Sequence, residues 1–281
     1  MVADRKGVMM RQVFRRSHNN IWEKEWNRLL SQEQKFIYDR QKRKSLGLND
    51  KIEKVMPANM QETLDKAFIK GFKLIFEKGT GVVEKTFNKK KIENEYKINQ
   101  YAMKLEESPE SVRKFRRQAA KSKNFNMAVS AVEGGAFGIF GVGVPDIPVF
   151  TGVMLKSVYE IALHYGFEYT SEEEQVFILK LIETSLSFGT DLRKKDILLN
   201  RWIAGEKEFT ETKEVQMVST ADRLSEELLY MKFLQTLPIV GIVGGAVDVW
   251  CLEQITSYAQ LKYQRRFLQN KKNDRKKPLD S

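Results

Sequence analysis

Apolar residues recur at three- and four-residue steps along most of the chain, which is the spacing of amphipathic helices. One early face comprises Ile21, Trp22, Trp26, Leu29, Leu30, Ile37 and Tyr38, with Asn19 or Asn20 available as a cap. A second stripe runs from Met60 to Ile75, after Pro57 at a suitable first helical position. The pattern predicts a helix over each of these two segments.

Local signals predict further helices downstream. Ser108-Pro109-Glu110 combines a cap, a proline at the first position and an acidic first turn, and Ser171 with Glu174 matches a capping box. We expect further helices over about 82–106, 108–132, 148–165, 171–186, 191–203, 212–236 and 238–269. Residues 138–144 are the only short strand that the pattern allows. The sequence therefore predicts an all-α protein, a single domain of eight to ten helices.

Composition and charge narrow the class of protein. The 281 residues carry a formal net charge of +11, and 42% of them are hydrophobic, enough to build a core. Residues 1–130 hold 30 basic and 16 acidic side chains, and Lys262 to Lys277 contains eight basic residues against Asp274 alone. The basic residues are thus concentrated at both ends of the chain, around a less charged middle.

Few residues are available for metal or disulfide chemistry. Cys251 is the single cysteine, which excludes an intramolecular disulfide and a cysteine-based zinc site, and we expect it to be a buried, inert thiol. With only two histidines, a multi-histidine metal centre is excluded as well. Glu160 and His164 stand four residues apart on a helix, but no third or fourth ligand is evident, so we expect a chance pairing at the helix surface.

No window supplies the run of about 18 apolar residues that a membrane-spanning helix needs. The best candidates, 136–155 and 237–252, are interrupted by Pro145, Asp146 and Pro148 and by Asp248, respectively. The first residues lack the apolar core of a signal peptide. With one thiol and no export signal, we expect a cytoplasmic protein.

Two glycine-rich apolar segments, 134–148 and 237–248, depart from ordinary helix composition. A glycine weakens a helix by about 1 kcal/mol relative to alanine, so glycines at this density need another reason. Small residues let backbones approach closely. We therefore expect the two segments to pack against each other as glycine-rich helical hairpins.

Motifs in and around these segments resemble the EcsC family. The resemblance rests on Gly134-Gly135 with the spaced glycines, on Pro145-Asp146-Ile147-Pro148 and on the stretch from Ile161 to Phe167. It continues with Leu237-Pro238-Ile239-Val240-Gly241, Gly244-Gly245-Ala246 and the stretch from Tyr263 to Leu268. The family usually carries Asn where this chain has Asp248.

The resemblance implies a bacterial protein of a family named after an operon that includes an ABC exporter, and it implies no established activity. Its signature assigns these candidate functional residues: Gly134, Gly135, Gly138, Gly141, Pro145, Asp146, Pro148, Tyr165, Gly166, Pro238, Gly241, Gly244, Gly245, Asp248, Arg265 and Arg266. It suggests three parts, an amphipathic basic helix over 1–50, an EcsC-like domain over 51–270 and a basic tail over 271–281.

The two acidic signature residues each allow two interpretations. Asp146, between two prolines, is expected to cap the helix that begins near Pro148, and the alternative is an ion or substrate site. Asp248, if buried, needs a cationic or amide partner, and the alternative is catalysis. The glycines also suggest a phosphate loop, but no preceding strand and no Lys-Ser or Lys-Thr pair supports one.

We therefore expect a non-enzymatic cytoplasmic protein that associates peripherally with an anionic membrane surface or with a membrane protein. An ABC transporter is the partner that the resemblance implies. No catalytic residue, cofactor or metal is assigned, and no motif indicates specific nucleic-acid binding. The alternative is a hydrolytic enzyme that uses Asp146 and Asp248 with a bound ion. Whether Trp22 and Trp26 face a membrane or the core stays open from the sequence.

Overall fold

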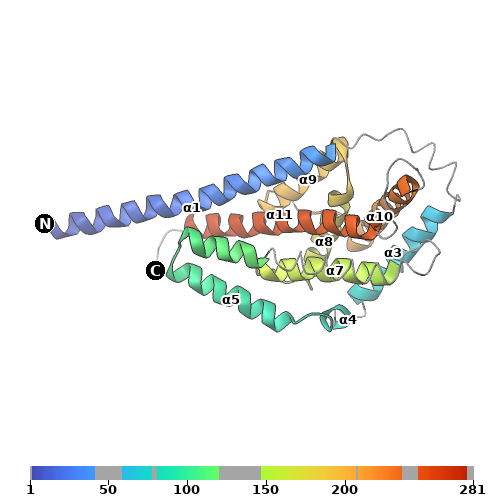
Figure 1. Ribbon diagram of the computed structural model, residues 1–281, viewed down its shortest axis with the longest axis horizontal. Helices are drawn as coiled ribbons and strands as arrows, with labels where there is room; N and C mark the ends of the chain where they lie inside the picture. The colour runs from blue at the N-terminus through green and yellow to red at the C-terminus, as the bar shows by residue number, and fades with distance from the viewer. Residues whose placement is uncertain are drawn as a thin grey trace.

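The structure, a computed structural model, describes residues 2–41, 59–77, 81–119, 147–206, 208–235 and 246–276. The side chains of residues 2–20, 82, 232–235, 246–248 and 275–276 lie outside this description. Each secondary-structure element among the described residues is a helix (Figure 1). The prediction of an all-α domain is therefore confirmed.

Ten helices lie within the described residues. Their bounds are α1 Val2–Gln41, α3 Met60–Glu77, α4 Gly81–Glu84, α5 Lys89–Leu105, a helix over 109–119, α7 Ile147–His164, α8 Glu172–Leu186, α9 Gly189–Ile203, α10 Lys213–Gln235 and α11 Ala246–Lys276. Two predicted caps are confirmed, because the hydroxyl of Ser108 accepts from the amide of Ser111 and that of Ser171 accepts from the amide of Glu174, each at 3.2 Å. Each bond satisfies an amide that has no carbonyl partner in the first helical turn.

The single helix predicted over 82–106 is wrong, because the chain forms α4, a turn and then α5. The Thr86 hydroxyl donates to the Val83 carbonyl at 2.6 Å, at the end of α4. The side chain of Asn88 then accepts from the amide of Lys91 at 2.9 Å and begins α5. Short polar side chains compete in this way for backbone groups that would otherwise continue a helix.

Helix α1 is longer than the pattern predicts. It begins at Val2 and runs through Asn19 and Asn20, so a cap at either asparagine is wrong. Residues 2–20 contain no proline, and extending a helix costs far less than starting one. The apolar stripe that begins at Ile21 therefore marks where α1 packs on the body of the protein, and does not mark where the helix begins.

Helices α7, α8 and α11 form the centre of the molecule. α7 contacts α3, α4, α5 and α11, while α11 also contacts α1, α8, α9 and α10 (Figure 1). Their side chains supply much of the core, including the fully buried Tyr159, Phe177, Ile182 and Ile255. The ring of Tyr159 stacks on that of Tyr169, with 4.0 Å between the centroids.

The tryptophan face of α1 packs on this core. Trp22 is only 9% exposed, Leu29 is fully buried, and the Trp22 ring lies 6.2 Å from the ring of Phe267 in α11. Trp26 is half-buried, and the guanidinium of Arg265 lies over its ring at 5.1 Å. These two indole rings therefore face the core.

The predicted contact between 134–148 and 237–248 falls almost entirely outside the described residues, as does the short strand at 138–144. α7 begins at Ile147 and α11 at Ala246, so a helix follows each glycine-rich segment or begins within it. Pro148 is exposed in the first turn of α7, a position where its missing amide costs nothing. Cys251 is buried, as predicted.

Candidate functional site

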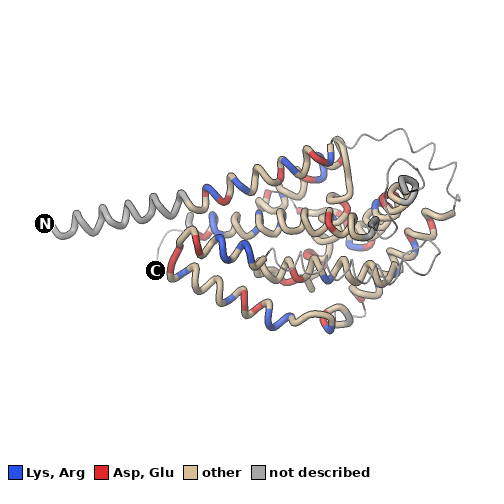
Figure 2. The backbone as a smooth tube through the Cα atoms, in the orientation of Figure 1, with Lys and Arg blue, Asp and Glu red and all other residues tan. Residues whose placement is uncertain are grey.

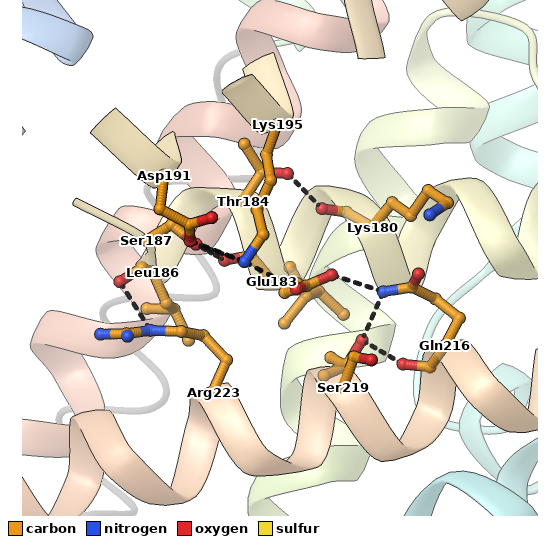
Figure 3. Close-up of polar contacts among 12 residues, drawn as sticks. Lys180, Glu183, Thr184, Leu186, Ser187, Asp191, Lys195, Gln216, Ser219 and Arg223 are labelled. Atoms are coloured by element: carbon orange, nitrogen blue, oxygen red, sulfur yellow. Dashed lines mark hydrogen bonds and ion pairs between the residues drawn. The ribbon is translucent and has the colours of Figure 1, made fainter. Parts of the chain in front are cut away.

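Cationic side chains from three helices meet the carboxyl end of α8. The Leu186 carbonyl accepts from Arg223 Nε at 3.1 Å and from Arg40 Nη2 at 2.6 Å. Figure 3 shows Arg223 and Lys195 at this end, with Lys195 Nζ 2.8 Å from the Glu183 carboxylate. The last carbonyls of a helix are unpaired and carry partial negative charge, which these cations neutralise. Because Arg40 belongs to α1, the contact also fixes the end of α1 against α8.

A buried charge cluster joins α1 to α9 and α11. Lys262 is fully buried, and its ammonium nitrogen lies 2.8 Å from Glu33, 2.7 Å from Asp196 and 2.7 Å from the Asn200 amide oxygen. Arg265 Nε donates to the same Glu33 carboxylate at 2.9 Å. Two cations thus balance two carboxylates, as burial of charge requires. The signature residue Arg265 therefore holds α1 in place.

Arg266, the next signature residue, links α11 to α8. Its Nη1 donates to Glu174 Oε1 at 2.7 Å, and the hydroxyl of Tyr263 donates to the same oxygen at 2.6 Å. The guanidinium lies over the rings of Phe167 and Phe177 at 4.1 and 4.5 Å, a cation–π arrangement. Burial, together with the charge of Glu174, raises the pKa of Tyr263 well above its ordinary value. The ion pair of Arg266 and Glu174 is largely buried. Arg266 therefore stabilises the packing of α11 on α8.

Tyr165 and Gly166 end α7. Tyr165 is buried, and its hydroxyl accepts from Gln260 Nε2 at 2.7 Å. Gly166 has a φ of +81°, and its amide donates to the Leu163 carbonyl at 2.9 Å. A Cβ atom at Gly166 would overlap the ring of Tyr96 from α5. Two separate reasons therefore favour glycine at this position, the left-handed backbone and the close approach of α5.

The remaining signature residues are not placed by the structure, apart from the exposed Pro148. Outside the described side chains lie Gly134, Gly135, Gly138, Gly141, Pro145, Asp146, Pro238, Gly241, Gly244, Gly245 and Asp248. The cap expected at Asp146 and the partner expected for Asp248 therefore stay predictions.

Glu160 and His164 are both buried on α7, at 7% and 8% exposure, so their expected location at the helix surface is wrong. α7 is covered by neighbours on several sides, which buries positions that an amphipathic pattern would leave exposed. Burial lowers the pKa of His164, and the negative charge of Glu95 works in the opposite direction. Among the described residues, no group of three His, Cys, Asp or Glu side chains is placed to hold a metal ion.

A groove of about 910 Å³ lies between α1, the 109–119 helix and α11. Arg28, Lys35 and Arg40 from α1, together with Arg116 and Arg117 from 109–119, contribute positive charge to its lining. Figure 2 shows the basic positions of these two helices on the tube. The apolar part of the lining comes from Phe36, Trp250 and Leu261, so the groove combines cations with an aromatic surface. We call it the basic groove.

The charges of the basic groove are only partly neutralised within the protein. Arg40 is bonded to α8, and Arg116 Nη1 lies 2.6 Å from the Glu25 carboxylate. Arg28, Lys35 and Arg117 form no ion pair or hydrogen bond with any described side chain. The acidic lining residues are Asp39 and Glu253, so cations outnumber them. Unpaired cations beside aromatic rings suit an anionic group attached to an apolar body.

Sequence reasoning did not identify this groove. Arg28, Lys35 and Arg117 belong to no recognised motif. One signal was present, because Arg28, Lys35 and Asp39 recur at seven- and four-residue steps and so share a helical face. The contribution from 109–119 comes from a helix distant in sequence, which spacing alone does not reveal.

The described residues define an all-helical protein with a groove lined by basic and aromatic side chains. A model of the EcsC protein family matches residues 23–268, which is most of the chain. The chain therefore belongs to the EcsC protein family, as its motifs predicted. No helix among the described residues is long and apolar enough to cross a bilayer.

Two relatives from Bacillus subtilis (strain 168) are similar to half of this chain. An uncharacterised protein, YdbA, is 27% identical over 149 residues, which cover 49% of this chain and 52% of YdbA. Protein EcsC is 27% identical over 146 residues, covering 50% of this chain and 58% of EcsC. The chain thus aligns with little more than half the length of either relative. No solved structure matches it.

Proposed function

We propose that this EcsC-family protein is a non-enzymatic protein that associates peripherally with the anionic inner face of the cell membrane. The observation that carries the proposal is the basic groove, where Arg28, Lys35 and Arg117 have no partner among the described side chains. A formal charge of +11 supports it. Each Lys or Arg near an anionic leaflet contributes about 1 kcal/mol to binding, so three such residues produce measurable affinity.

We infer the residues that supply this affinity from which cations are already paired within the protein. The sequence left open whether Trp22 and Trp26 face a membrane or the core, and both rings pack on the core. Of the eight basic residues from Lys262 to Lys277, Lys262, Arg265 and Arg266 are committed to carboxylates. We therefore propose that electrostatic attraction at unpaired surface cations contributes to the binding.

A membrane transporter is the second candidate partner, because the family is named after an operon that includes an ABC exporter. The hydrolytic alternative, which uses Asp146 and Asp248, gains no support, because both side chains lie outside the described residues. An anionic membrane is the simpler hypothesis, since binding to it requires only unpaired surface cations.

Flotation with phosphatidylglycerol vesicles tests the proposal, with phosphatidylcholine vesicles as the uncharged comparison. The full chain should float with the anionic vesicles at 0.1 M salt and stay behind at 1 M. The Debye length shrinks over that range from about 10 Å to 3 Å and screens exposed charges. A protein that stays soluble at low salt with both vesicles overturns the proposal and favours a protein partner.

Substitutions are better probes than truncations here, because removing 1–45 or 262–281 would also remove core residues such as Leu29 and Phe267. The triple variant Arg28→Gln, Lys35→Gln and Arg117→Gln should float several-fold less at low salt than the unmodified chain. A control variant of equal charge change replaces Lys70, Arg193 and Lys194 by Gln, all exposed and away from the groove. Equal loss in both variants would show that net charge, and not the groove, sets the affinity.

A further inference from the structure

Helix α5 carries exposed apolar residues in a regular row. Ile98, Tyr101 and Leu105 are 67%, 64% and 71% exposed, and they follow one another at three- and four-residue steps. Residues at this spacing lie on one face of a helix. Most other exposed large hydrophobic residues among the described positions occur singly or in pairs. A single such residue is ordinary for a protein surface, but a continuous row on one helix indicates a binding surface.

The row is not needed for the fold. α5 packs on α7 through its opposite face, where Ile92, Asn99 and Met103 are buried. Figure 1 shows α5 along the lower edge of the molecule, with no described helix beneath it in that view. The apolar row therefore lies on the outer face of the helix.

Lysines border this row. Lys90, Lys97 and Lys104 recur every seven residues and so form a second row beside Tyr101. All three are exposed, and none pairs with a described acidic side chain. Apolar and aromatic residues edged by lysines are the composition of a helix that lies in the interface of an anionic bilayer.

We infer that the outer face of α5 is the surface on which the protein lies on an anionic lipid bilayer, with Ile98, Tyr101 and Leu105 entering the headgroup zone. This inference rests on the proposed membrane association and specifies its contact surface. Charge complementarity selects the partner, because the lysine row faces outward without a counter-ion from the described residues. The ring of Tyr101 suits the interface, since one end of it is apolar and the other can stay hydrated.

The helix that follows α5 along the chain also lines the basic groove. The 109–119 helix, which supplies Arg116 and Arg117, follows α5 directly, and the rings of Tyr96 and Phe115 lie 6.4 Å apart across the two helices. Because Tyr96 lies near the buried face of α5, the 109–119 helix packs behind α5, and the apolar row on the outer face stays uncovered by it.

A dye at Tyr101 gives a direct readout, because the single cysteine of the chain, Cys251, is buried and does not compete for labelling. Tyr101→Cys is labelled with an environment-sensitive fluorophore and mixed with phosphatidylglycerol vesicles at low salt. We expect a blue shift with increased intensity, as the dye leaves water. The same dye at Val218→Cys on α10, also exposed, should not shift. A shift at Val218 with none at Tyr101 overturns the inference.

A pair of matched variants measures the contribution of the apolar row. Ile98→Asn with Leu105→Asn should lower the vesicle partition coefficient by at least tenfold, while circular dichroism stays unchanged. The control, Val215→Asn with Val218→Asn, removes two exposed apolar residues from α10 and should leave partitioning within twofold. If the unmodified chain floats but the α5 variant floats equally well, the inference fails and the proposed function stands. If the unmodified chain does not float at all, the proposed function fails, and this surface assignment fails with it.

Discussion

Replacing Gly166 by alanine should destabilise the protein more than the same change at other glycines with positive φ. Gly166, Gly189 and Gly205 have φ values of +81°, +61° and +73°. A left-handed backbone costs a residue with a Cβ about 1–2 kcal/mol, so this penalty is common to all three. Only at Gly166 would the new Cβ meet another group, the ring of Tyr96, whereas the space beside Gly189 and Gly205 is open.

The size of the additional effect follows from overpacking. Forcing a methyl group into an occupied site costs about 1–3 kcal/mol, because side chains or backbone must shift. Gly166→Ala should therefore lower the free energy of unfolding by about 2–5 kcal/mol, against about 1–2 kcal/mol for Gly189→Ala or Gly205→Ala. The difference measures how closely α5 approaches the end of α7.

Urea denaturation followed by circular dichroism measures all three variants on one scale. Repeating Gly166→Ala in a Tyr96→Ala background isolates the overlap, because only the backbone penalty remains once the ring is gone. If Gly166→Ala costs no more than Gly189→Ala, or if removing the Tyr96 ring leaves the loss unchanged, close packing of α5 on Gly166 is refuted.

Further predictions concern the buried groups. Lys262→Met leaves two buried carboxylates with Arg265 as their one remaining cation, so it should lower the free energy of unfolding by about 3–5 kcal/mol. The control Lys66→Met removes an exposed ion pair and should lower it by less than about 1 kcal/mol, both measured by urea denaturation. Burial lowers the pKa of His164, so below about pH 6.5 the unfolded chain binds a proton that the folded chain does not. Unfolding free energy should therefore fall between pH 7 and pH 5.5, less so in His164→Gln; an equal fall in that variant refutes the assignment. A thiol reagent should modify Cys251 only in urea, and rapid reaction in buffer would contradict its burial.

Local signals in the sequence account for the helices well. The caps at Ser108 and Ser171 act within four residues of their partners, so they are readable from the sequence alone. Asn88 caps α5 in the same way, but the polar sequence around it offered few apolar positions to mark the break between α4 and α5. Periodicity reports which residues share a face and does not report which other element covers that face.

Long-range pairing is what the sequence did not reveal. Lys262 opens a run of basic residues that reads as a solvated tail, yet it is fully buried because Glu33 and Asp196 meet it from α1 and α9. The cations of the basic groove are the opposite case, because they stay unpaired and the sequence does not show that they lie together. Arg28 and Arg117 resemble every other surface arginine until two helices distant in sequence are brought together.

The charge cluster at Lys262 has a consequence for how the protein reaches its native state. Glu33 and Lys262 are separated by 229 residues, so α1 cannot complete its contacts until α11 has been synthesised. At about 5–20 residues per second, this interval is on the order of ten to fifty seconds. During that time Trp22 and Leu29, buried in the finished fold, have no α11 to cover them. The apolar face of α1 therefore reaches its buried position only late in synthesis, when α11 becomes available to cover it.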